Sequence, residues 1–237
     1  MKKVLLIVLL VLLCIFGAVG YAGYRVLSFL KSCNGCVYEY NGGEVVHGSG
    51  HSVTQSRSVI GFSAVHLAGA ADVVIDRDGT ESLTITGDDN LLPLFTSEVK
   101  DGVLTLGVAK GKSFEGKAPA YRITAAALRD IEVAGSGDVT ANDIGGDTLL
   151  VKIAGSGDAR LKGQINTLTI SVAGSGDVDA SLLKAKSATV SVAGSGDVTV
   201  NASDTLIARV TGSGDVRYLG APKLTTTVTG SGSVKPK

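Results

Sequence analysis

The chain has 237 residues, and its 22 basic and 22 acidic side chains give a formal net charge of zero. This balance argues against a nucleic-acid partner, which needs a basic patch on one face of the protein. The 32 glycines, with one methionine and no tryptophan, indicate tight turns and strands with small side chains.

Residues 1–24 have the pattern of a secretory signal or a membrane anchor. The segment begins Met-Lys-Lys, continues with an apolar run from Val4 to Phe16, and then has the small residues of Gly17–Gly20. Uncharged sequence extends to Tyr24, which gives about the ~20 residues that a membrane helix needs. Either way, we expect the N-terminus to enter a membrane at least transiently and the rest of the chain to be exported.

Residues 25–51 are expected to form a linker with two cysteines and two histidines. Cys33, Cys36, His47 and His51 follow the spacing C-x2-C-x10-H-x3-H, which comes close to that of a zinc finger. However, the histidines enclose Gly-Ser-Gly rather than a helical turn, and the stretch lacks a finger's core residues. Because export favours disulfides, we prefer a Cys33–Cys36 disulfide or a pair of thiols with exposed histidines. A metal site made by all four residues is the alternative.

Residues 52–134 are predicted to form an irregular N-terminal β cap and the first coils of a stack. The strand candidates are Ser58–Leu67, Asp72–Ile75, Ser82–Thr86, Thr96–Val99, Val103–Val108 and Tyr121–Thr124. Lys100-Asp101-Gly102 predicts a hairpin turn. The segment Ala68–Val73 is interpreted as a degenerate copy of a motif that recurs later in the chain.

Residues 135–237 are organised by the motif Gly-Ser-Gly-Asp. The motif begins at Gly135, Gly155, Gly174, Gly194 and Gly212, and an altered copy begins at Gly230. Successive starts are 20, 19, 20, 18 and 18 residues apart. A near-constant period of this size is typical of a solenoid, in which neighbouring coils bury a shared core.

Alternating apolar and polar residues predict which side chains of each coil point inward. Apolar residues stand two positions before each motif, at Ile153, Val172, Val192, Val210 and Val228. They also follow each motif directly, at Val139, Ala159, Val178, Val198 and Val216. Each coil should therefore contain at least two short strands with the motif as the corner between them.

The motif aspartates are expected to form a ladder along the stack, because coils repeat at the ~4.8 Å spacing of neighbouring strands. The ladder consists of Asp138, Asp158, Asp177, Asp197 and Asp215. Like charges at this distance repel by roughly 1 kcal/mol in water, and by more in a less polar environment. The preferred explanation is structural, with carboxylates that accept hydrogen bonds from turn amides. Shared cations, Ca²⁺ above all, are the alternative.

The last motif is predicted to end the stack. Ser233 replaces the aspartate, and Pro236 follows between two lysines. Proline and lysine at a sheet edge disfavour a further strand.

Together these features resemble the head GIN domain family of autotransporter adhesins, over about residues 48–237. The resemblance is carried by Gly48-Ser49-Gly50, Arg57 with Phe62, Gly87–Leu92, Val99–Leu104 and the serial Ala-Gly-Ser-Gly-Asp-Val motifs. It implies an all-β, right-handed parallel β-helix, whose coils here have about 18–20 residues, and a place in the cell envelope. The chain departs from the family pattern at Ala68–Asp72 and in the Cys/His segment.

The expected function is that of an exported, non-catalytic envelope module, adhesive or scaffolding, with a polysaccharide or a cell-surface protein as partner. Specificity is expected at the corners that vary most between repeats: Asn142–Asp147, Lys162–Asn166, Leu183–Ser187 and Tyr218–Lys223. A polysaccharide-active β-helix enzyme is one alternative, but repeated aspartates are equivalent and do not provide a separate acid and base. A calcium-binding solenoid that uses the aspartate ladder is the other. No catalytic residue and no cofactor other than calcium is expected.

Overall fold

The computed structural model describes residues 45–237. The chain divides into two units, Met1–Gly42 and Gly43–Lys237, and the described residues belong to the second. The expected signal or anchor, residues 1–24, lies outside the described residues, as do Cys33 and Cys36. Within residues 45–237 no helix is long and apolar enough to span a membrane.

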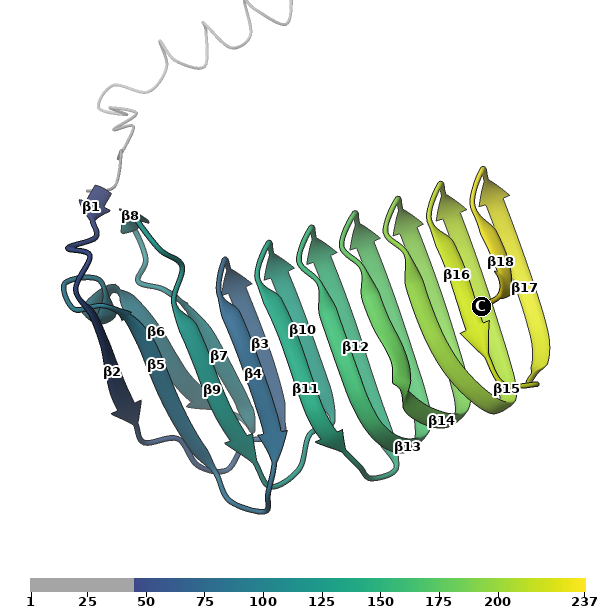
Figure 1. The fold of residues 1–237 in the computed structure, drawn as a ribbon, viewed down its shortest axis with the longest axis horizontal. Coiled ribbons are helices and arrows are strands. Elements are labelled where there is room, and N and C mark those ends of the chain that lie inside the picture. The colour runs from purple at the N-terminus through teal and green to yellow at the C-terminus, as the bar shows by residue number, and fades with distance from the viewer. Residues whose placement is uncertain (1–44) are drawn as a thin grey trace, which may run out of the picture. The chain divides into compact units, whose positions relative to one another are not determined.

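Stacked parallel coils form most of the described unit (Figure 1). Their strands are β10 (Asp130–Gly135), β11 (Asp138–Ile144), β12 (Thr148–Gly155), β13 (Ala159–Gly174), β14 (Val178–Gly194), β15 (Val198–Gly212), β16 (Asp215–Leu219), β17 (Lys223–Gly230) and β18 (Ser233–Pro236). Parallel pairing places each motif glycine opposite the next, from Gly135 through to Gly230. The predicted all-β parallel solenoid is thus confirmed.

Each coil has two corners on opposite edges of the stack. The motif forms one corner, at the top in Figure 1. At the other, which we call the bend, β13, β14 and β15 continue from one motif to the next with shifts in register, as between Arg160 and Lys162. The changes in repeat length are therefore absorbed at the bends, while the motif corners stay in register.

The first coil of the stack in sequence is formed by β3 (Ala64–Gly69) and β4 (Asp72–Arg77). Gly69 lies opposite Gly135 and Asp72 opposite Asp138, so the degenerate motif occupies the predicted place. On their other side, β3 and β4 pair in parallel with β7 (Val103–Val108) and β9 (Ala120–Ala125). The coil on the cap side of β3 and β4 is therefore formed by residues that follow them in the sequence.

Antiparallel strands close the N-terminal end of the stack. β6 (Phe95–Lys100) pairs with β7, β5 (Ser82–Asp88) with β9, and β2 (Ser52–Arg57) with β5. A short 3-10 helix, η1 (Leu92–Leu94), and a parallel pair, β1 (Val45–His47) with β8 (Ser113–Glu115), complete the cap. These strands cover the coil edge at this end.

Two local predictions for the cap have opposite outcomes. The hairpin between β6 and β7 is confirmed: Asp101 and Gly102 both have positive φ, 51° and 79°, as a two-residue hairpin turn requires. The predicted strand Ser58–Leu67 is wrong in its first half. Residues 58–63 form a loop, because Gly61 has a φ of 75° and its amide donates to the Glu81 carboxylate at 2.6 Å.

The core lies between the two faces of the coils. Val139, Ile153, Val172, Val192 and Val210 are each at most 1% exposed, as the alternation predicts. Burying a side chain of this kind contributes roughly 1.5–3 kcal/mol. The stack is therefore held together by continuous apolar columns rather than by the core of any single coil.

The last motif lies in the outermost coil of the described residues, as predicted. The segment with Pro236 does form a strand, β18, which pairs with β16, and Pro236 lies opposite Tyr218. β17 and β18 pair on one side only, and Val228, expected in the core, is 41% exposed. The lysines and the proline therefore occupy the outermost strand, and no other described strand pairs beyond it.

Candidate functional site

The motif corners bring the backbones of successive coils into close contact. Gly174 has a φ of 138°, and a Cβ there would collide with the carbonyl oxygen of Gly155 in the preceding coil. A Cβ at Gly176 would collide in the same way with the carbonyl oxygen of Gly157. The Ser175 amide donates to the Gly155 carbonyl at 2.9 Å. Both glycines are thus required by the stacking itself.

The aspartate ladder lies along this edge and is a chain of hydrogen bonds. Each Oδ1 accepts the backbone amide of the next aspartate: Asp138 from Asp158 at 3.0 Å, Asp158 from Asp177 at 3.0 Å, Asp177 from Asp197 at 2.7 Å, and Asp197 from Asp215 at 2.9 Å. At the last rung, Asp215 accepts the amide and the hydroxyl of Ser233. One oxygen of every ladder carboxylate is therefore already engaged.

Basic side chains of the same edge compensate part of the ladder's charge. Arg217 donates to Oδ2 of Asp197 at 3.1 Å and to Oδ2 of Asp215 at 3.3 Å. Lys235 lies 3.4 Å from the same Asp215 oxygen. The Ser233 hydroxyl and Lys235 hold the pKa of Asp215 below its usual value. Because Ca²⁺ takes six to eight oxygen ligands, this pattern of contacts favours the structural explanation over calcium.

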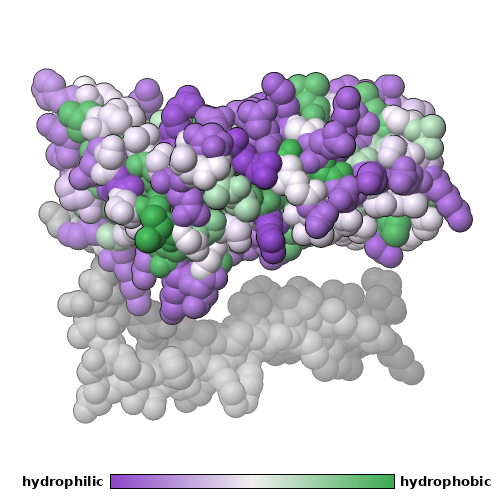
Figure 2. Space-filling model, turned by 90° about the horizontal axis from the view of Figure 1, so that it is seen from below, coloured by the Kyte–Doolittle hydropathy of each residue, from purple (hydrophilic) through white to green (hydrophobic). Residues whose placement is uncertain are grey.

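Two open hollows lie at the bends of β13, β14 and β15. The first, with a volume of about 230 Å³, is lined by Thr140, Asn142, Arg160, Leu161, Lys162, Asp179 and Leu182. The second, of about 330 Å³, is lined by Gln164, Ile165, Lys184, Ala185, Lys186, Asn201 and Ser203. Both include residues of the variable corners. Figure 2 looks onto this side of the stack and shows hydrophilic side chains mixed with smaller apolar areas.

Basic residues dominate the lining of these hollows. Arg160, Lys162, Lys184 and Lys186 line them together with one carboxylate, that of Asp179. Arg160 also lies 3.8 Å from Oδ2 of the ladder residue Asp158. The Ser181 hydroxyl, above other contributions, lowers the pKa of Asp179, which therefore stays ionised near neutral pH. We call these four basic residues the basic bend.

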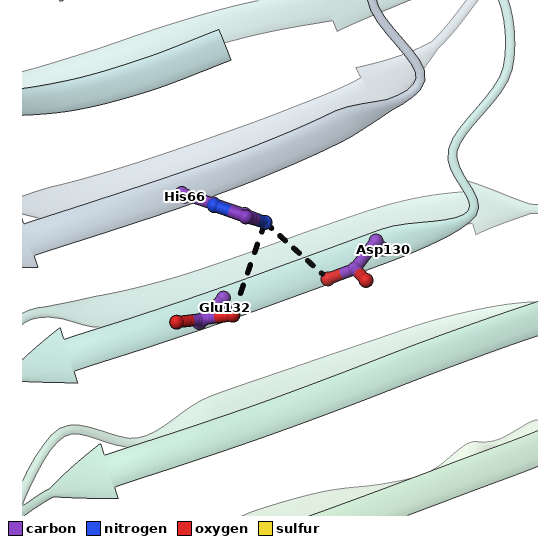
Figure 3. A group of neighbouring side chains, drawn as sticks. All are labelled: His66, Asp130 and Glu132. Atoms are coloured by element: carbon purple, nitrogen blue, oxygen red, sulfur yellow. Dashed lines mark ion pairs between the residues drawn. The ribbon is translucent and has the colours of Figure 1, made fainter. Parts of the chain in front are cut away.

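A third group of polar side chains, missed from the sequence, lies on the outer face of β3 and β10. His66 Nε2 is 3.7 Å from Asp130 Oδ1 and 3.9 Å from Glu132 Oε2 (Figure 3). The sequence does contain a sign of this group, because His66 stands three positions before Gly69 and Glu132 three positions before Gly135. Aligning the two motifs therefore places these residues at equivalent positions. Only the register of β3 against β10 shows that they are neighbours.

The profile of the family "Putative auto-transporter adhesin, head GIN domain" matches residues 61–222, which is more than half of the chain. The chain belongs to the head GIN domain family. Its fold is similar to that of a "putative adhesin" from Bacteroides fragilis, with 28% identity, a TM-score of 0.67, and 81% of this chain and 100% of that chain covered. No curated protein gives a significant match.

A second solved structure shows the same head GIN domain fold. It is titled "putative lipid binding protein" and comes from Parabacteroides distasonis. Its identity is 21% and its TM-score 0.50, over 82% of this chain and 100% of that chain. At this identity the likeness concerns the fold alone.

Several of the segments that carry the resemblance to the head GIN domain family contact one another in the cap. Ser49 donates its amide to Asn90 Oδ1 at 2.9 Å, and Gly50 donates to the buried carboxylate of Asp88 at 3.2 Å. Arg57 donates to the carbonyls of Leu92 at 2.9 Å and Phe95 at 2.7 Å. These segments therefore have a structural role.

The two histidines of the Cys/His segment lie in or beside the cap. His47 Nδ1 is 3.1 Å from Glu115 Oε2, and both side chains are well exposed. His51 is exposed, and its carbonyl accepts the amide of Asp89. Neither histidine joins a metal-ligand group among residues 45–237. Since Cys33 and Cys36 lie outside the described residues, the four-residue metal site and the disulfide stay predictions.

Proposed function

We propose that this protein is an exported, non-catalytic adhesive module of the cell envelope, which binds acidic polysaccharides through its basic bend. The family and the adhesin-titled structure from Bacteroides fragilis support an adhesive role. The excess of basic side chains in the bend hollows supports the acidic ligand. The N-terminal signal or anchor pattern supports export to the envelope.

The charge of the basic bend is the observation that carries the ligand class. Lys162, Lys184 and Lys186 are exposed, and they come from neighbouring coils that the register of β13 and β14 places side by side. Several cations grouped on a rigid edge suit the closely spaced carboxylates, sulfates or phosphates of an acidic polymer. Attraction of this kind steers association and weakens as salt rises.

The shape of the hollows also suits a polymer. Small-molecule sites commonly enclose most of the ligand, whereas both of these hollows, of about 230 and 330 Å³, are open to solvent. Leu182, which is 68% exposed, offers an apolar contact beside the cations. A sugar chain can lie across both hollows and contact several coils.

The same geometry supports a non-catalytic role. Glycoside hydrolysis commonly needs one protonated and one ionised carboxyl group on either side of the bond. Asp179 is the only carboxylate that lines the two hollows, and its lowered pKa does not suit a general acid. Each ladder aspartate has one oxygen bound to a backbone amide, so these carboxylates are already engaged in the stack.

The proposal can be tested by binding the purified full chain to alginate, an acidic polysaccharide, and to neutral dextran, over a range of salt concentrations. We expect retention on alginate that falls with salt, little retention on dextran, and no new reducing ends. The double variant Lys184→Glu/Lys186→Glu should lose most of the binding. The matched control is Lys110→Glu/Lys117→Glu, which changes the charge equally at exposed positions in the N-terminal region.

Each contrary result identifies a different error. Equal loss in both double variants would show that only net charge matters, which excludes a defined site at the bend. Equal retention on dextran would exclude charge recognition. New reducing ends would make the protein a polysaccharide-active enzyme. Binding to anionic lipid vesicles but not to alginate would replace the polysaccharide by a membrane surface.

A further inference from the structure

The group on the outer face of β3 and β10 combines three potential metal ligands from two neighbouring strands. His66 in β3 lies opposite Glu132 in β10. Asp130 precedes Glu132 by two residues and therefore points to the same face of the strand. The small residue Ala64 lies opposite Asp130. As Figure 3 shows, the imidazole Nε2 points between the two carboxylates.

The direct contacts within this group are too long to be hydrogen bonds. The two N···O distances, 3.7 Å and 3.9 Å, exceed the 2.7–3.2 Å typical of N–H···O bonds. Asp130 Oδ1 is buried from solvent and has no hydrogen-bond partner. A buried acceptor without a partner destabilises the fold, and more so when it is charged. An ion at this oxygen would remove that cost.

We propose that His66, Asp130 and Glu132 bind a divalent transition-metal ion such as Zn²⁺. One ligand atom from each residue lies within 4.8 Å of the other two. Tetrahedral ligands with bonds of about 2.1 Å lie roughly 3.4 Å apart, so closure on a metal needs only a small contraction of the side chains. The imidazole favours zinc or a similar ion over Ca²⁺ and Mg²⁺, which prefer oxygen ligands alone.

The surroundings leave this metal accessible. The side chains of His66, Asp130 and Glu132 are 33%, 23% and 35% exposed, so the remaining coordination positions face water. Lys152 Nζ lies 3.6 Å from Glu132 Oε2 and competes with a cation for that carboxylate. Removal of the Lys152 charge should therefore tighten metal binding. If the group is only an ion-pair network, the same substitution removes a favourable contact and brings no gain in metal affinity.

The test is calorimetric titration of the full chain with Zn²⁺ after treatment with EDTA. Because Cys33, Cys36, His47 and His51 offer a second set of ligands, we compare site variants in the wild-type chain and in a Cys33→Ser/Cys36→Ser background. His66→Ala and Asp130→Asn should weaken one binding event at least tenfold in both. Lys152→Met should strengthen the same event. Glu98→Gln, at an exposed position of β6 outside both sets of ligands, is the matched control.

Stability measurements separate loss of binding from loss of fold. His66 and Asp130 are partly exposed, so the variants should unfold cooperatively in EDTA near the wild-type temperature. In the Cys33→Ser/Cys36→Ser background, Zn²⁺ should raise the melting temperature of the chain with His66 but not of the chain with His66→Ala. Wild-type affinity in both His66→Ala and Asp130→Asn, or loss of all Zn²⁺ binding in the double-serine chain alone, would overturn the proposal. So would weaker binding in Lys152→Met.

Discussion

The backbone amide of Asp197 donates a hydrogen bond of 2.7 Å to Oδ1 of Asp177, in the preceding coil. The same relationship joins the other ladder aspartates, so a row of like charges is also a row of backbone hydrogen bonds. A carboxylate suits this place because it accepts a backbone amide on one oxygen and leaves the other for solvent or an arginine. The ladder thus connects coil to coil outside the apolar core.

Substitution of Asp177 separates the role of its oxygen from that of its charge. Asp177→Asn keeps an acceptor for the Asp197 amide and removes repulsion along the ladder, so stability should stay within about 0.5 kcal/mol of wild type. Asp177→Ala removes the acceptor and should cost about 1 kcal/mol. Urea unfolding of both variants, with Ser175→Ala as a control at the same corner, measures the difference.

Calcium dependence of the same variants tests the alternative explanation of the ladder. If the aspartates bind Ca²⁺, calcium should raise the melting temperature of wild type, EDTA should reverse the effect, and Asp177→Asn should lose it. If the ladder is structural, calcium added after EDTA treatment leaves the wild type and both Asp177 variants unchanged. An equal cost of the asparagine and alanine variants without calcium dependence would contradict the acceptor role described above.

Gly174 should be among the least replaceable residues of the domain. Gly174→Ala places a Cβ against the Gly155 carbonyl and also demands a positive φ. We expect a loss of about 3 kcal/mol or more. Gly146→Ala is the matched control, since Gly146 has a φ of 129° but open space around it, and should cost only about 1 kcal/mol. Similar losses for the two variants would show that backbone strain, not stacking, makes the motif glycine necessary.

Much of the solenoid follows from local sequence, because each coil repeats the same alternation and the same glycine corner. That regularity suffices to predict the buried columns, such as Val172 and Val192, and the ladder of aspartates. The hairpin at Asp101 and Gly102 is equally local, since both turn residues tolerate positive φ. At these positions each coil has the same packing and backbone requirements, so the same residue types recur.

Other features depend on contacts between segments whose neighbours cannot be read from the repeat pattern. The coil made by β7 and β9 precedes β3 and β4 in space but follows them in the chain, and no period marks this insertion. The proposed metal ligands, His66, Asp130 and Glu132, meet only because β3 pairs with β10 across that insertion. The hollows at the bends arise from register shifts in long strands, which vary from coil to coil.

Arg57 should stabilise the N-terminal cap. Its guanidinium donates to the carbonyls of Leu92 and Phe95, at the start and just past the end of η1. Arg57→Ala leaves both carbonyls without this donor and should cost about 2 kcal/mol, as expected for hydrogen bonds to a charged group. Arg77→Ala is the control, because exposed Arg77 makes one weaker contact, 3.3 Å to the Ala126 carbonyl. Equal unfolding midpoints for the two variants would contradict this role.

The C-terminal coil should loosen in acid, and Ser233 should control how much. The Ser233 hydroxyl is the largest cause of the lowered pKa of Asp215, whose ordinary value is 3.8. Because the folded pKa lies below the unfolded one, the contribution of Asp215 is fully present above about pH 4. It is lost as the pH falls through the folded pKa. Hydrogen exchange of the β17 and β18 amides, corrected for intrinsic rates, should therefore show less protection at pH 3 than at pH 6.

A serine variant isolates this effect from the titration of other carboxylates. Ser233→Ala removes the hydroxyl donor, which brings the pKa of Asp215 nearer to its ordinary value, so the loss of protection in acid should be smaller than in wild type. Ser231→Ala changes a hydroxyl at the same corner without a bond to Asp215 and should behave as wild type. If all three proteins lose the same protection between pH 6 and pH 3, Asp215 does not govern the end of the stack. The exposed apolar positions of β17 would then be the better explanation of its fraying.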